Sequence, residues 1–215
     1  MIPPYLTDLI SDRPQLQTFH GISTLTRAAI GDLQLPSGRV VGADPHLAAE
    51  ARPYARTVRP GSYPVSLSVV RFPDGEEQIA AAWLQFAERL PVRWEYASCH
   101  EKPKVREPAY IVDSGSGSFM SAEAAAALEE RGDDAFSELI YAELERTSRD
   151  WCVVPVPGAE PLTAAVFSSG YGDGVYATFW GFSGSGEPVR LLTDFDVLGT
   201  EADPGPPKKP WWKLW

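Results

Sequence analysis

Residues 163–198 constrain the fold more than any other stretch, because they consist of three apolar runs separated by two glycine-rich breaks. The first break reads Gly-Tyr-Gly-Asp-Gly at 170–174, and the second reads Ser-Gly-Ser-Gly at 183–186. Each run has the length and composition of a strand, and the breaks have the composition of turns. Short turns join antiparallel strands, since parallel strands need long crossovers. The stretch therefore predicts an antiparallel meander, with residues 175–182 as a central strand covered on both faces.

Several earlier runs also have strand character. Apolar residues on both sides of Pro36-Ser37-Gly38 predict a hairpin with a Pro/Gly turn. Residues 63–72 alternate apolar residues with serines, and the chain returns after Pro-Asp-Gly at 73–75. A brief helix is expected at residues 6–10. The expected strands before the meander are 30–35, 39–41, 63–72, 79–86, 92–97 and 110–112.

Residues 121–150 contain the clearest helix signals. Ser121 is a suitable N-cap for a first helix that Gly132 ends, and Asp133 or Asp134 can begin a second. The second helix is expected to be amphipathic, with one face lined at helical spacing by Phe136, Leu139, Ile140 and Leu144. The predicted fold is α+β: mainly antiparallel sheet in meanders and hairpins, with a sandwich as one arrangement, and two consecutive helices around 121–150.

The chain is expected to form a single α+β domain over residues 1–202, followed by a separate tail. Its 44% hydrophobic and 11% aromatic residues are enough for a substantial core. Residues 203–215 read DPGPPKKPWWKLW, a proline-stiffened, lysine- and tryptophan-rich segment. Such segments favour extended polyproline II conformations and resist packing into a core.

The charge of the chain limits the partners that it can bind. Nineteen basic residues against 29 acidic ones give a net charge of −10, which disfavours nucleic acid and anionic membranes and suits a basic partner. Residues 121–150 hold nine acids and three arginines, so the negative charge is concentrated there. No segment has the length of a membrane span, and the first residues do not resemble a signal peptide. Cys99 and Cys152 are most simply free thiols, which predicts a cytoplasmic protein.

Four aspartates are candidates for a chemical site. Asp44, Asp113, Asp173 and Asp194 each lie at a strand end or in a glycine-flanked turn, where side chains are often presented to ligands. If the turns converge, the four carboxylates could bind a divalent cation, and Asp113 and Asp173 could act as a catalytic pair. The alternative is that aspartate and glycine only shape the turns. No phosphate loop, dinucleotide loop or nucleophile elbow occurs, and the three histidines are isolated in the sequence.

Two other groups of residues are candidates for binding. No core pattern surrounds the tail tryptophans Trp211, Trp212 and Trp215. They can dock on a partner, on a membrane interface or on the protein itself, and the alternative is that the tail is disordered. The acids of the second helix can face a basic protein. Within residues 203–215 and 121–150, the candidate binding residues are Trp211, Trp212, Trp215, Glu138, Glu143 and Glu145.

Six blocks of the sequence carry a resemblance to a known family. They are LPSGRVV with ADP at 35–45, PGSYPV at 60–65, PVRWE at 91–95, VDSGSG at 112–117, SSGYGDGVY at 168–176 and LTDF at 192–195. In this order they resemble the bacterial domain-of-unknown-function family numbered 4241. The resemblance implies a single cytosolic bacterial domain and supplies no activity. Where that family often has a cysteine after the second glycine of the DxGxG block, this chain has Ser118, which argues against a thiol nucleophile there.

These observations favour a non-catalytic protein-interaction domain without a cofactor. An immunity-like role, in which an acidic domain neutralises a basic toxin, suits the charge. The first alternative is a metal- or carboxylate-dependent hydrolase that uses the aspartate cluster. The second is a carbohydrate-binding module with a platform of tryptophans, although core packing explains Trp83, Trp94, Trp151 and Trp180 more simply. The sequence leaves homo-oligomerisation open.

Overall fold

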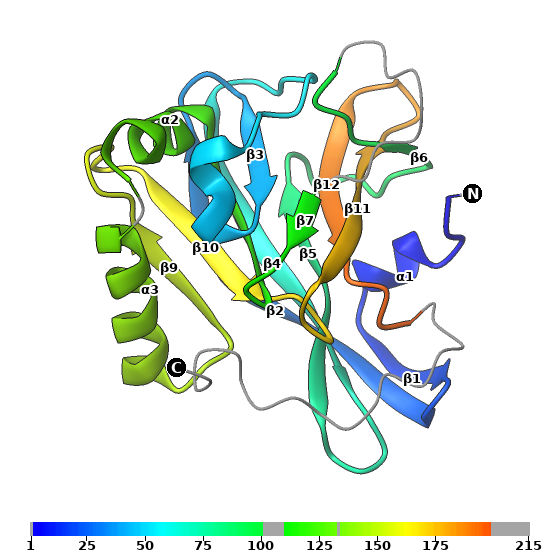
Figure 1. The fold of residues 1–215 in the computed structure, drawn as a ribbon. Coiled ribbons are helices and arrows are strands. Elements are labelled where there is room, and N and C mark those ends of the chain that lie inside the picture. The colour runs from blue at the N-terminus through cyan, green and yellow to red at the C-terminus, as the bar shows by residue number, and fades with distance from the viewer. Residues whose placement is uncertain (1, 101–109, 133, 199–215) are drawn as a thin grey trace.

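The computed structural model describes residues 2–100, 110–132 and 134–198, which form two antiparallel sheets and a helical layer (Figure 1). The larger sheet has the strand order β1-β2-β4-β5-β12-β11-β6, and β7 pairs with β11. The α+β prediction with mainly antiparallel sheet is confirmed. The strands of this sheet are β1 (Arg13–Thr18), β2 (Gly21–Leu35), β4 (Gly61–Arg71), β5 (Glu77–Gln85), β6 (Arg93–Tyr96), β7 (Tyr110–Val112), β11 (Gly174–Phe182) and β12 (Pro188–Asp194).

The smaller sheet has the order β3-β8-β10-β9 and forms the middle layer of the structure. Its strands bury residues on both faces, and in β8 neighbouring residues such as Phe119 and Met120 belong to different apolar clusters. A strand that is buried on both sides is usually apolar throughout; β8 departs from this, since it also buries Ser116, Ser118 and Ser121. The strands are β3 (Val40–Ala43), β8 (Ser116–Ser121), β9 (Trp151–Pro155) and β10 (Thr163–Ser168).

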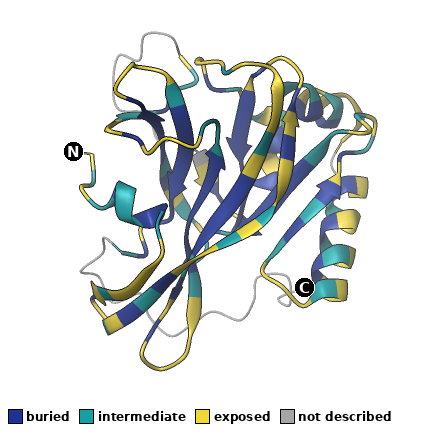
Figure 2. Ribbon diagram, turned by 180° about the vertical axis from the view of Figure 1, so that it is seen from behind, coloured by how far each residue is buried: buried dark blue, intermediate teal, exposed yellow. Residues whose placement is uncertain are grey.

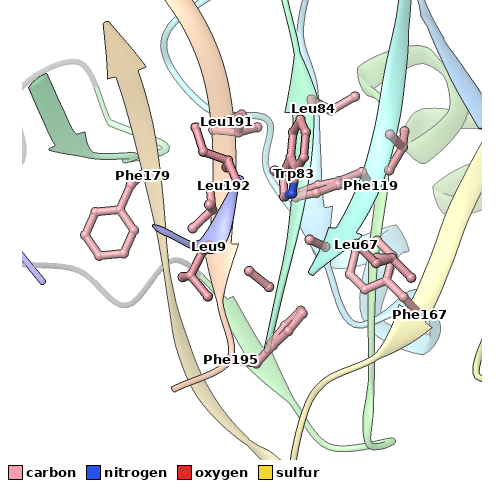
Figure 3. Packing of buried hydrophobic residues seen from close by; sticks show 14 of the residues in the cluster. Leu9, Leu67, Trp83, Leu84, Phe119, Phe167, Phe179, Leu191, Leu192 and Phe195 are labelled. Carbon is pink, nitrogen blue, oxygen red and sulfur yellow. The ribbon is translucent and has the colours of Figure 1, made fainter. Parts of the chain in front are cut away.

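The first apolar cluster joins the two sheets. Phe119 on β8 and Phe167 on β10 contact each other edge to face at 5.4 Å, and Phe167 also lies 5.9 Å from Phe195 after β12. Leu67 on β4 and Leu191 on β12 belong to the same cluster (Figure 3). Its burial supplies most of the hydrophobic stabilisation that holds the sheets together.

The second cluster lies between the smaller sheet and the helices. α2 (Ala122–Arg131) begins at Ser121, whose hydroxyl accepts the Ala124 N–H at 3.1 Å, as the capping prediction requires. α3 (Asp134–Thr147) buries Phe136, Ile140 and Leu144 at four-residue spacing, and exposed and buried residues alternate along it (Figure 2). Leu139 was expected on this buried face, but it is 38% exposed because it lies to one side of the stripe. A short 3₁₀ helix, η1 (Pro45–Glu50), completes this layer.

The strands were predicted better than their pairing. The expected hairpin around Pro36-Ser37-Gly38 is wrong, because β2 pairs with β4 in the larger sheet whereas β3 pairs with β8 in the smaller one. The expected meander is half right: β11 and β12 form a hairpin, but β10 belongs to the smaller sheet. In both places the turn carries the chain from one sheet to the other.

The N-terminal residues add two elements. α1 (Leu6–Leu9) confirms the predicted short helix, and its Leu6 and Leu9 are buried in the first apolar cluster. β1 and the first half of β2 form an edge hairpin that the sequence did not predict. No helix among the described ranges has the length and apolar character needed to cross a membrane. The predicted domain boundary at residue 202 and the tail lie outside the described residues.

Candidate functional site

Asp44 anchors the loop between β7 and β8. Its side chain is buried at the end of β3, where it caps η1 by accepting the His46 N–H at 2.9 Å. The same carboxylate accepts the backbone N–H groups of Asp113 and Ser114, at 2.9 and 2.8 Å, and the Ser114 hydroxyl at 2.9 Å. Four donors fill the acceptor positions of one carboxylate. This arrangement is that of a turn anchor, and a metal-binding role for Asp44 stays a prediction.

The half-buried Ser114 of this loop and the buried Ser116 and Ser118 of β8 also bond within the structure. The Ser114 and Ser116 hydroxyls lie 2.7 Å apart, and the buried Ser118 hydroxyl donates to the Ala43 carbonyl at 2.8 Å. A hydroxyl that is buried and bonded to a backbone carbonyl is a structural group rather than an accessible nucleophile. The loop therefore serves to fix β7 against β3.

Asp113 and Asp173 lie just beyond one end of the β7–β11 ladder. The last pair of this ladder joins Val112 to Gly174, so the two aspartates occupy the next positions along the two strands. Both residues are exposed, and neither carboxylate forms an ion pair with another described residue. Long-range strand pairing thus places Asp113 and Asp173 at neighbouring register positions; their role as a catalytic pair stays a prediction. Within the described parts of the chain, no three His, Cys, Asp or Glu side chains are grouped so that they could hold a metal ion.

Asp194 lies at the end of β12, where α1 reaches the sheet. It is 5% exposed, accepts the Tyr5 hydroxyl at 2.9 Å and accepts the Asp196 N–H at 3.0 Å. Burial raises the pKa of Asp194 to about 6, since no cation compensates the charge among the described residues. The neighbouring Asp196 has a φ of 59°, a strained value for a residue other than glycine. Asp194 thus binds the N-terminal segment, separately from the group around Asp44.

The three predicted acids of α3 differ in their surroundings. Glu138 and Glu145 are exposed. Glu143 binds Arg146 through two hydrogen bonds, of 2.8 and 2.6 Å, which lower the pKa of its carboxyl. Glu138 and Glu145 are therefore better placed than Glu143 to meet a partner. The candidate residues Trp211, Trp212 and Trp215 lie outside the described residues.

The packing of His46 was not foreseen from the sequence. The His46 ring, which is isolated in the sequence, lies with Nδ1 2.9 Å from the Ser137 hydroxyl and stacks on Tyr141 at 5.8 Å. This contact fixes η1 against α3, and no local pattern could have indicated it. Trp83 and Trp180 are buried, as core packing predicts.

Comparison with known proteins places the chain in a family. No curated protein and no solved structure shows significant similarity to it. The family model described as "Protein of unknown function (DUF4241)" matches residues 33–193, which include the smaller sheet, both long helices and the larger sheet apart from β1 and most of β2. The match covers the Asp44 anchor, the β7–β11 ladder and Asp173, and it begins after α1. The chain therefore belongs to the DUF4241 family.

Proposed function

We propose that this protein binds a basic partner protein through the exposed face of α3, and that it does so in the cytoplasm without catalysing a reaction. The observation that carries the proposal is the pair Glu138 and Glu145, which lie two helical turns apart on the exposed side of α3. An immunity-like role, in which the acidic face covers a basic surface of a toxin, is one form of this function.

The exposed face of α3 has the make-up of an interface. Leu139 is 38% exposed and Ala142 is exposed, and both lie between the two glutamates in the sequence of the helix. An apolar centre with a charged rim is typical of protein–protein interfaces. Neither Glu138 nor Glu145 forms an ion pair with another described residue, so both charges are available to a partner.

The charge of the helical layer supports the same partner chemistry. α2 carries three acids and one arginine, and α3 carries four acids and one arginine. Such a one-sided charge attracts a basic surface and repels nucleic acid. The two free thiols, Cys99 and Cys152, support the cytoplasmic location.

The test compares two double charge reversals with the same change in net charge. Glu138→Lys with Glu145→Lys alters the α3 face, and Asp32→Lys with Glu76→Lys is the matched control on exposed positions of β2 and the β4–β5 turn. Proteins captured from a lysate of the source organism are identified, purified and titrated against each variant by calorimetry. We expect the α3 variant to bind the partner at least about tenfold more weakly, and the control to bind as the wild type does.

Equal affinities of the two double variants would refute the α3 face as the binding surface. A separate variant that lacks residues 203–215 measures how much the tail contributes to the affinity for the partner. If the deletion alone abolishes binding and the α3 variant binds normally, the tail and not the helix is the binding element.

A second candidate function is supported by the neighbouring register positions of Asp113 and Asp173 beyond the β7–β11 ladder. Two exposed carboxylates in neighbouring turns could bind Ca²⁺ or Mg²⁺, or act as the acid and base of a hydrolase. Calorimetric titration of each ion into the wild type and into an Asp113→Asn, Asp173→Asn variant tests this. We expect the wild type to release or absorb heat on binding the ion, and the variant to show no such heat. The same heat from both proteins, or no heat from either, would speak against an ion site at these aspartates.

A further inference from the structure

A cavity of about 680 Å³ lies at the end of the larger sheet, away from the residues considered above. Its walls come from the segment before β4, the end of β5 and the start of β12. Tyr63 and Phe86 form an aromatic wall, with ring centroids 5.1 Å apart in an edge-to-face arrangement, and Val58 adds an apolar side chain. The Tyr63 hydroxyl donates to the Arg59 carbonyl at 2.6 Å, which fixes the ring in place. Volume and lining match the usual dimensions of small-molecule sites.

The charged groups around the cavity are mainly positive, in contrast to the chain as a whole. Arg59 and Arg89 are exposed at its edge, and Arg59 forms no ion pair with another described residue. Arg89 lies 3.7 Å from Glu187, a distance at which two exposed side chains bind each other only weakly. Two arginines and one glutamate thus line the cavity together with its aromatic wall.

A third arginine lies behind the wall of the cavity. Arg190 is 4% exposed and donates through Nη1 to the carbonyls of Ala87 and Val189, both of which line the cavity. Its buried Nε has no hydrogen-bond partner within the described parts of the chain. Burial lowers the pKa of Arg190 to about 10, so the group stays positively charged at neutral pH. A buried cation that the nearby Glu88 carboxylate offsets only in part adds positive potential to the adjoining surface.

We propose that this cavity binds a small organic anion with a flat apolar body, such as an aromatic carboxylate. The flat body lies against Tyr63 and Phe86, and the anionic group lies at the edge between Arg59 and Arg89. Planar guanidinium groups suit carboxylates, because they offer two parallel N–H donors. The site is independent of the α3 face, so either proposal can fail without the other.

Titration with 2-naphthoate, followed by ¹H–¹⁵N NMR, tests the proposal on the full chain. We expect a Kd of about 1 mM or tighter, as for a small ligand with few heavy atoms, with shifted signals at residues 57–63, 86–89 and 187–189. The neutral 2-naphthamide, which has the same ring and nearly the same size, should bind about tenfold more weakly.

Three exposed-site variants test the role of the charges. Arg59→Ala and Arg89→Ala should each weaken binding of 2-naphthoate about threefold, whereas Glu187→Gln should strengthen it about twofold. Arg71→Ala is the matched control, because Arg71 is similarly exposed and lies 3.8 Å from Glu77 elsewhere on the sheet. The proposal is overturned if the cavity signals do not move up to roughly 10 mM ligand, if the amide binds as tightly as the carboxylate, or if Arg71→Ala weakens binding as much as Arg89→Ala.

Discussion

Replacement of Asp194 by asparagine is expected to stabilise this protein at neutral pH and not at acidic pH. The carboxyl is 5% exposed, and its pKa is raised from 3.8 to about 6 by burial, which disfavours the charged form. Asparagine has nearly the same shape and no charge. Its oxygen can still accept the Asp196 N–H, and its amide nitrogen can donate to the Tyr5 oxygen in place of the bond that Asp194 accepts.

The size of the stability gain follows from the difference between the pKa of Asp194 in the folded state and its pKa in the unfolded state. A rise of about two units corresponds to about 3 kcal/mol of lost stability once the group is ionised in both states. Asp194 binds its proton more tightly in the folded state, so its contribution to stability is full below pH 3.8 and is lost as the pH rises through 6. The hydrogen bond between the neutral amide and Tyr5 is expected to be weaker than the one that the Asp194 carboxyl accepts, by about 1 kcal/mol. The net gain of Asp194→Asn is therefore about 2 kcal/mol at neutral pH and absent near pH 4.

Urea denaturation followed by tryptophan fluorescence measures this difference, because Trp83 and Trp180 are buried in the folded state. The scan should cover pH 4 to 7 at submicromolar protein, since the isoelectric point of about 4.8 lies within the range. Asp173→Asn is the control, because Asp173 is exposed. If Asp194→Asn changes the free energy of unfolding by the same amount at the acidic end of the scan as at the neutral end, the buried charge of Asp194 does not destabilise the fold.

Three further predictions concern single side chains. Asp44→Ala should lower the free energy of unfolding in urea by at least about 3 kcal/mol, because four donors lose their acceptor; a loss below about 1 kcal/mol would contradict the anchoring role. Gly38→Ala should be far more destabilising than Gly75→Ala in thermal melts: both have positive φ, but only at Gly38 would a Cβ collide with a backbone carbonyl, that of Val58. Cys152 is buried, with its pKa raised to about 12, so it should react with a disulfide reagent only after unfolding; rapid reaction in the native state would refute this.

The sequence predicted strands from local patterns, and it failed where pairing depends on distant segments. Runs such as 174–182 and 188–194 have enough β-branched and aromatic residues, and enough turn residues around them, to be recognised. Nothing local distinguishes β10, which pairs in the smaller sheet, from a strand that pairs with β11. The edge strand β1 was missed because it is mostly exposed and contains Pro14, a residue that edge strands tolerate and pattern recognition rejects.

The four candidate aspartates show which part of a site a sequence can supply. The four aspartates could be identified because they lie at strand ends or beside glycines. Their roles, however, depend on hydrogen-bond donors that come from distant parts of the chain. The Asp44 carboxylate accepts hydrogen bonds from backbone N–H groups about 70 residues away in the sequence. The Asp194 carboxylate accepts one from the Tyr5 hydroxyl, 189 residues away. Only Asp113 and Asp173 keep exposed carboxylates without an ion-pair partner among the described residues. To bind a ligand, Asp44 would have to give up four hydrogen bonds, and Asp194 is buried. Of the four carboxylates, those of Asp113 and Asp173 are therefore the ones that a cation or substrate could reach first.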